Sequence, residues 1–102
     1  MMTEEMLNVY VELFSAMHQA YRALSMHQAY RALSVDPASS ARAAVIRDHA
    51  FQMGQSIADT WGFPGLTRII GEMEERGDML AVSFLNHKWS GVKFPDGGTW
   101  CA

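Results

Sequence analysis

The chain lacks the features that mark disulfide-stapled, secreted and membrane-spanning proteins. Among its 102 residues there is one cysteine, Cys101, so an internal disulfide framework is excluded and a reducing compartment is expected. No stretch approaches the roughly 18 apolar residues of a membrane-spanning helix, and the acidic start MMTEEM lacks the basic segment of a secretory signal. We therefore expect a cytoplasmic protein of bacterial type that does not associate with a membrane.

Basic residues are few and scattered. Eight Lys and Arg residues stand against eleven Asp and Glu residues, which gives a net charge of −3. Because no basic stripe is present to neutralise a phosphate backbone, the composition argues against nucleic-acid binding. A single domain, 1–102, of this size buries only about two-thirds of its surface on folding, so self-association is expected to contribute to its stability.

Glycine and proline are absent from the first 34 residues, which predicts a long uninterrupted helix. Thr3, followed by Glu4 and Glu5, has the pattern of an N-cap with acidic residues in the first turn. Apolar residues then recur at alternating steps of four and three, the seam of a helix that packs on another helix. These residues are Tyr10, Phe14, Met17, Tyr21 and Leu24.

A perfect tandem duplication interrupts this seam. Residues 17–25, MHQAYRALS, are repeated without change as residues 26–34. Nine residues turn a helix through about two and a half turns, so the second copy places Met26, Tyr30 and Leu33 on the face opposite the first copy. Good helix formers predict a continuous helix through Ser34. The alternative is a break near Ser25 that leaves one copy as a loop.

Length indicates how the duplication arose. A first helix with both copies would run for roughly 31 residues and about 47 Å, beyond the span of about 35 Å expected of a compact domain of this size. Without one copy it would have roughly 22 residues, close to the roughly 25 of the second helix. We interpret the second copy as a later insertion, natural or engineered, that merely lengthens the helix.

The remaining helices are delimited by proline and glycine. Asp36 and Pro37 predict the start of a second helix that runs to about residue 61 and ends at Gly62. Its apolar face includes Met53, Ile57 and Trp61. A shorter helix is expected between residues 66 and 73.

The segment 79–89 is ambiguous between a helix and a strand, because Leu80, Val82 and Phe84 alternate, but its length favours a helix that Asp78 caps. Residues 90–102 are expected to form an irregular glycine-rich tail, with a possible small hairpin that docks on the helices. The predicted fold is therefore all-α, with two long antiparallel helices at about 3–34 and 37–61, one or two shorter helices and this tail.

For each residue that could act in catalysis or metal binding, we favour a structural role. His18 and His27 are one residue in two copies, His49 is expected to make a structural polar contact, and Ser83 and His87 lack an orienting acid. The acidic run Glu72, Glu74, Glu75 and Asp78 is typical of a solvated helix face. The sequence therefore predicts no catalytic, metal or cofactor-binding residues and no enzymatic activity.

Large apolar side chains exceed what a small helical monomer needs: eight Met, three Trp, three Tyr and five Phe. We expect a homodimer that forms along the long helices and binds a protein partner, as a regulatory inhibitor or adaptor. The predicted interface comprises Tyr10, Phe14, Met17, Tyr21, Leu24, Met26, Tyr30, Leu33, Met53, Ile57 and Trp61. The alternative is a helical bundle that binds an apolar ligand or a haem-like cofactor with Trp61, Met53 and one histidine.

Overall fold

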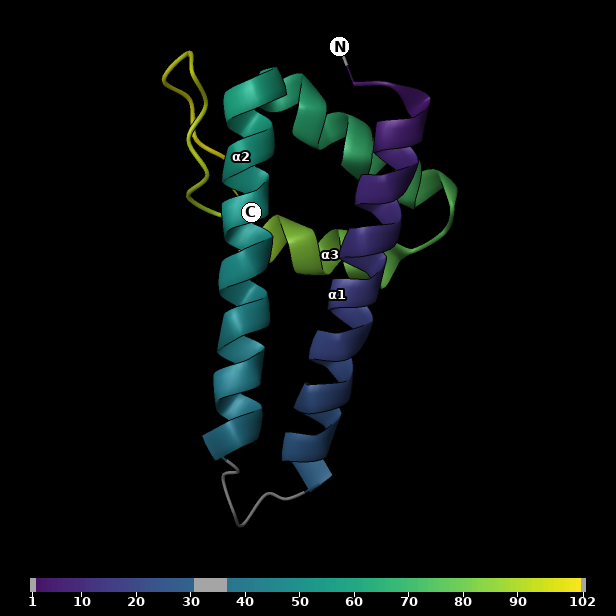
Figure 1. Ribbon diagram of the computed structural model, residues 1–102, viewed down its shortest axis with the longest axis vertical. Helices are drawn as coiled ribbons and strands as arrows, with labels where there is room; N and C mark the ends of the chain where they lie inside the picture. The colour runs from purple at the N-terminus through teal and green to yellow at the C-terminus, as the bar shows by residue number, and fades with distance from the viewer. Residues whose placement is uncertain (1, 31–36, 102) are drawn as a thin grey trace.

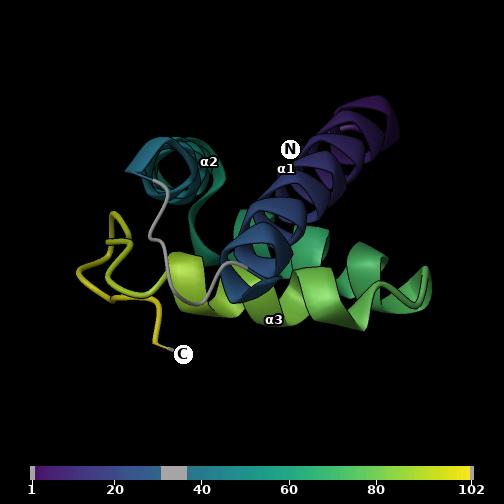
Figure 2. The same cartoon turned by 90° about the horizontal axis from the view of Figure 1, so that it is seen from below.

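The computed structural model describes residues 2–30 and 37–101, and at residues 25–30 and 37–40 it describes the backbone only. The described residues form the helices α1 (Glu4–Tyr30), α2 (Pro37–Glu75) and α3 (Met79–Lys88). α1 and the first part of α2 run antiparallel, and α3 crosses this pair near its mid-height (Figure 1). The second part of α2 and α3 form another layer (Figure 2). The predicted all-α fold with two long helices is confirmed.

α1 begins with the predicted cap and continues through the repeat. The hydroxyl of Thr3 accepts a hydrogen bond from the backbone N–H of Met6 at 3.1 Å. The helix extends without interruption to Tyr30, so the alternative of a break near Ser25 is wrong. The last four residues of the second copy, 31–34, lie outside the described residues.

α2 bends where the sequence predicts the end of the second helix. Gly62 has φ 70° and ψ −162°, outside the helical region, and Pro64 lacks the N–H that would continue the hydrogen-bond ladder. The chain turns at this point, and residues 63–75 supply the expected third helix. That part ends just before Gly77, whose φ of 78° belongs to the left-handed region.

The core lies where the three helices meet. The largest fully buried side chains are Phe14, Ile57, Leu66, Ile69, Met73, Leu85, Trp89 and Val92. Trp89 is central, because its ring lies edge-on to the ring of Phe14 with 5.3 Å between centroids. The indole N–H of Trp89 donates a hydrogen bond to the carbonyl oxygen of Ala50 at 3.1 Å, so this buried polar group is satisfied.

The ambiguous segment after residue 78 is helical. Val82 and Phe84 are buried while Leu80 is exposed, so the three residues do not share the single face that a strand would give them. Asp78 occupies the predicted N-cap position but makes no side-chain cap hydrogen bond to α3. Its carboxylate instead accepts a hydrogen bond from the Ser15 hydroxyl at 2.8 Å, and this contact ties α3 to α1.

The C-terminal tail turns back on itself and docks on α2. Lys93 and Thr99 form an isolated antiparallel bridge, and the N–H of Trp100 donates to the carbonyl of Val92 at 2.8 Å. The side chain of Gln55 holds this turn, since it accepts from the N–H of Lys93 at 3.0 Å and donates to the carbonyl of Lys93 at 2.8 Å. The burial of Val92 and Trp100 adds the apolar contact that a lone hairpin lacks.

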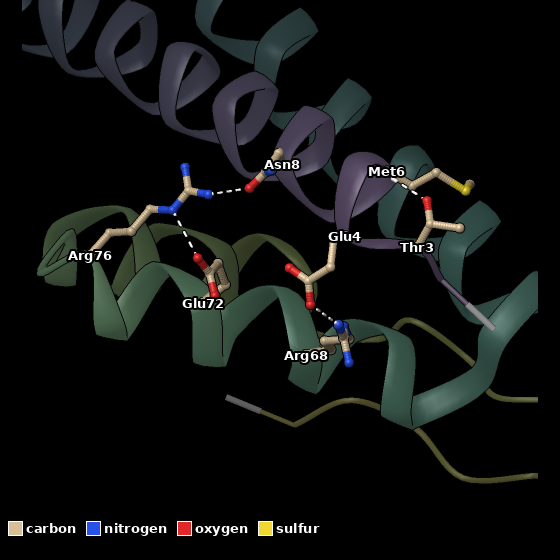
Figure 3. A network of polar contacts seen from close by, with 7 residues as sticks. All are labelled: Thr3, Glu4, Met6, Asn8, Arg68, Glu72 and Arg76. Atoms are coloured by element: carbon tan, nitrogen blue, oxygen red, sulfur yellow. Dashed lines mark hydrogen bonds and ion pairs between the residues drawn. The ribbon is translucent and has the colours of Figure 1, made fainter.

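Polar contacts fix the start of α1 against the second part of α2 (Figure 3). Arg68 pairs with Glu4 at 2.9 Å. Arg76 donates to the side-chain oxygen of Asn8 and pairs with Glu72 at 3.1 Å. These contacts are at the surface, so we expect them to orient the helices and to add little stability individually.

Gly54 is expected to be intolerant of any side chain because Trp89 packs directly on it. A Cβ atom at residue 54 would lie 2.6 Å from the indole Cδ1 and Nε1 of Trp89. We expect Gly54→Ala to lower the free energy of unfolding by about 1–3 kcal/mol, since the ring and its bond to Ala50 must shift. Urea denaturation measures the effect.

Gly71 supplies the control for this substitution, because a Cβ atom there meets nothing within 4 Å. Gly71→Ala is expected to raise the free energy of unfolding by about 0.5–1 kcal/mol through helix propensity and the entropy of the unfolded chain. A rise in the free energy of unfolding in both variants would show that Trp89 does not press on residue 54.

Candidate interaction surface

The predicted interface residues divide into buried and half-buried groups. Phe14 and Ile57 lie inside the protomer, so they contribute packing within the chain rather than exposed surface. Partly buried side chains pack against this core, and they include Tyr10, Met17, Tyr21, Met53 and Trp61. Leu24 is half-buried, while the side chains of Met26, Tyr30 and Leu33 lie outside the described part of the chain.

The predicted interface residues are covered because α1 and α2 pack through the predicted seam against each other and against α3. Tyr10 packs edge-on against Trp61 of α2, with 6.0 Å between ring centroids. Tyr21 packs against Phe84 of α3, with 5.1 Å between centroids. A seam of this spacing indicates that a helix is covered, but it does not distinguish a neighbour in the same chain from one in another chain.

A second apolar row on α1 remains exposed. Met6, Val9 and Leu13 are exposed to 38%, 58% and 42% of their full surface. The row continues at steps of four and three through smaller exposed residues, and we call the whole row the α1 stripe: Met6, Val9, Leu13, Ala16, Ala20 and Ala23. Most members lie one position before a residue of the predicted seam. The spacing of this row can be read from the sequence, but the adjacent seam of larger side chains has the same spacing and is the stronger pattern.

The α1 stripe leads into an apolar groove between α1 and the first part of α2. This groove, which we call the arm groove, has a volume of about 560 Å³. It is lined by Ala20, Ala23, Leu24, Ala41, Arg42, Val45 and Ile46. The alanine side chains are too short to fill the space between the two helices, and Val45 is left 66% exposed.

Titratable residues are mostly dispersed. His49 is exposed on α2, and Cys101 is a free exposed thiol. Within the acidic run, Glu72 pairs with Arg76 and Asp78 with Ser15, so these two carboxylates have structural partners. No group of three or more His, Cys, Asp or Glu side chains in the described parts of the chain has the arrangement of a metal site.

Two residues considered for the alternative ligand site, Trp61 and His18, pack against different partners. Trp61 packs against Tyr10, whereas His18 lies against Phe84 of α3 at 5.3 Å between ring centroids. A hollow beside Trp61 is lined by Pro64 and Arg68 among others, but by no histidine or methionine of α2. His18 therefore does not share a site with Trp61.

Comparisons with protein-family models, with curated proteins and with solved structures find no match to this chain. In residues 2–30 and 37–101, no helix combines the length and the apolar character needed to cross a membrane.

Proposed function

We propose that this chain is a small cytoplasmic interaction module that docks an amphipathic helix along the α1 stripe and into the arm groove. The observation that carries the proposal is the uninterrupted row of exposed apolar residues over five turns of α1. An exposed apolar row of this length is unfavourable in a monomer and typical of a helix-binding face.

The helix that we expect to occupy the α1 stripe and the arm groove belongs to a second copy of the chain, because the stripe is complementary to itself. Its N-terminal half has large side chains, Met6, Val9 and Leu13, and its C-terminal half has only alanines. In an antiparallel pair of α1 helices, the large half of each lies over the small half of the other. Such an arrangement is closed and two-fold symmetric, with Val9 at the level of the second copy's Ala20.

The regulatory proposal follows from the same surface. A helix of another protein with apolar residues at the same spacing would compete with the second copy for the arm groove. Exchange of one occupant for the other is how an inhibitor or adaptor would sequester its target. A small apolar ligand is the alternative occupant, since the groove volume of about 560 Å³ falls within the range of ligand sites. Native mass spectrometry distinguishes a ligand adduct from a dimer.

Charge in the α1 stripe is expected to abolish association without unfolding the protomer. Wild-type protein at micromolar concentration should scatter light as twice 11.4 kDa. Leu13→Glu and Val9→Glu should each weaken association at least about 100-fold, because each buries an unpaired carboxylate in the interface. The control is Met79→Glu, since Met79 is 56% exposed but lies on α3. A monomeric wild type, or a dimeric Leu13→Glu variant, would contradict the proposal.

Disulfide trapping tests the antiparallel register. In a Cys101→Ser background, Val9→Cys combined with Ala20→Cys should form a covalent dimer on mild oxidation. The single Val9→Cys variant should not, because its thiols lie about 16 Å apart along the antiparallel pair. Within one helix, residues 9 and 20 are also about 16 Å apart, so no disulfide within the same chain competes. Efficient trapping of the single variant would favour parallel helices.

A further inference from the structure

Basic side chains from both helices lie together where α1 faces α3. A hollow of about 330 Å³ lies between the two helices. α1 contributes His18 and Arg22 to its wall, and α3 contributes His87 and Lys88. No carboxylate lines the hollow, although the chain as a whole has a net charge of −3.

Among the described residues, no carboxylate forms an ion pair with the charged side chains of this hollow. In the described residues, ion pairs engage Arg47, Arg68 and Arg76, while neither Arg22 nor Lys88 lies within ion-pair distance of a described carboxylate. Cations in the last turn of a helix are favoured by the helix dipole, and this accounts for Lys88 at the end of α3. It does not account for Arg22, which lies two turns before Tyr30, the last described residue of α1.

Aromatic rings form the floor of the same hollow. The Lys88 ammonium lies 4.9 Å from the centroid of the Tyr21 ring and 5.9 Å from that of Phe84. It is also 3.4 Å from the Tyr21 hydroxyl, to which it donates. The two rings are 5.1 Å apart, and Phe84 is buried, so the lysine is held over a fixed aromatic surface.

We propose that this hollow binds a small anion that bears one aromatic ring, of the aryl phosphate or aryl carboxylate class. The anionic oxygens would accept hydrogen bonds from Arg22 and Lys88, with the Ser83 hydroxyl at the rim as a further donor. The aryl ring would rest against Tyr21 and against Leu80, which lines the same hollow and is exposed. A volume of about 330 Å³ matches a ligand of one ring and one acidic group, near the small end of protein ligand sites.

The test is titration calorimetry of the full chain with phenyl phosphate, benzoate, inorganic phosphate and phenol. Phenyl phosphate or benzoate should bind saturably, inorganic phosphate at least about tenfold more weakly, and phenol not measurably. Which of the two aryl anions binds tighter identifies the acidic group. Amide NMR shifts should concentrate at Tyr21, Ser83 and His87. Binding of inorganic phosphate as tightly as phenyl phosphate would overturn the aromatic part of the proposal.

Charge-removing variants test the named residues. Lys88→Met and Arg22→Gln should each weaken binding of the aryl anion about tenfold or more, because each removes a charge-assisted hydrogen bond. Lys93→Met is the matched control on the exposed tail turn and should bind as wild type. Lys88→Arg should restore most of the affinity, which a packing role of the lysine stem alone would not predict. Equal affinity in Lys88→Met and Lys93→Met would overturn the proposal.

Discussion

Phe14→Asp is expected to abolish the folded state at room temperature. Phe14 has no exposed surface, and its ring contacts that of Trp89 at 5.3 Å between centroids and that of Tyr10 at 6.5 Å. Removing a buried phenyl ring costs about 3–5 kcal/mol, and burying an unpaired carboxylate adds several more. Together these losses approach or exceed the roughly 5–15 kcal/mol by which a domain of this size is stable.

Circular dichroism should show loss of the cooperative thermal transition in Phe14→Asp. Ile57→Asp, at a residue with 2% of its surface exposed, should behave in the same way. Leu13→Asp is the matched control, because Leu13 precedes Phe14 on α1 but belongs to the exposed α1 stripe. It should retain a cooperative transition while losing association. A melting curve of Phe14→Asp that matches wild type would show that the three-helix core is misassigned.

Deletion of one copy of the repeat is expected to unwind the start of α2. Removing either nine-residue copy from the 102 residues leaves the same 93-residue sequence. The described part of α1 has 27 residues, including the first copy and residues 26–30 of the second, and it is close in length to the 25 residues from 37 to 61. α1 therefore uses the repeat as a helix alongside α2.

The register of the two helices supplies the physical reason. Tyr10 contacts Trp61, and Leu24 lines the arm groove with Ile46, so Ser25 is close to the level of Ile46. In the deletion variant only two residues would join Ser25 to Pro37. Pro37 lies nine residues before Ile46 in α2. The two joining residues reach about 11 Å, whereas the path across the helix pair and along α2 is about 16 Å. About two residues at the start of α2 must therefore open, because each residue that leaves the helix also lengthens the connection.

We expect the 93-residue variant to fold through its intact three-helix core but to lose about seven helical residues by circular dichroism, namely residues 26–30 of α1 and the opened start of α2. It should also associate more weakly, because α1 would then end at Ser25, directly after Leu24 of the arm groove, and helix ends fray. The same number of helical residues and the same oligomeric state in both proteins, with protease cleavage near Ser25 only in the longer one, would show that the extra copy is a passenger loop.

The sequence predicted helix positions well because the signals for them are local. Thr3 marks a helix start through its side-chain cap, and Pro37, Gly62 and Gly77 mark a start, a bend and an end through their own backbone preferences, whatever surrounds them. The role of Asp78 was less predictable. Its position as an N-cap is local, but the choice of Ser15 over the N–H groups of α3 depends on a helix 63 residues away in the chain.

What the sequence by itself determined is the helical periodicity of α1 and the presence of apolar residues around much of its circumference. Only the tertiary structure decided which apolar row is covered, because that depends on where α2 and α3 pack. The row containing Phe14 became core, and the row containing Leu13 became exposed surface. The basic hollow was likewise decided by tertiary packing, since His18 and Lys88 meet only when α3 crosses α1.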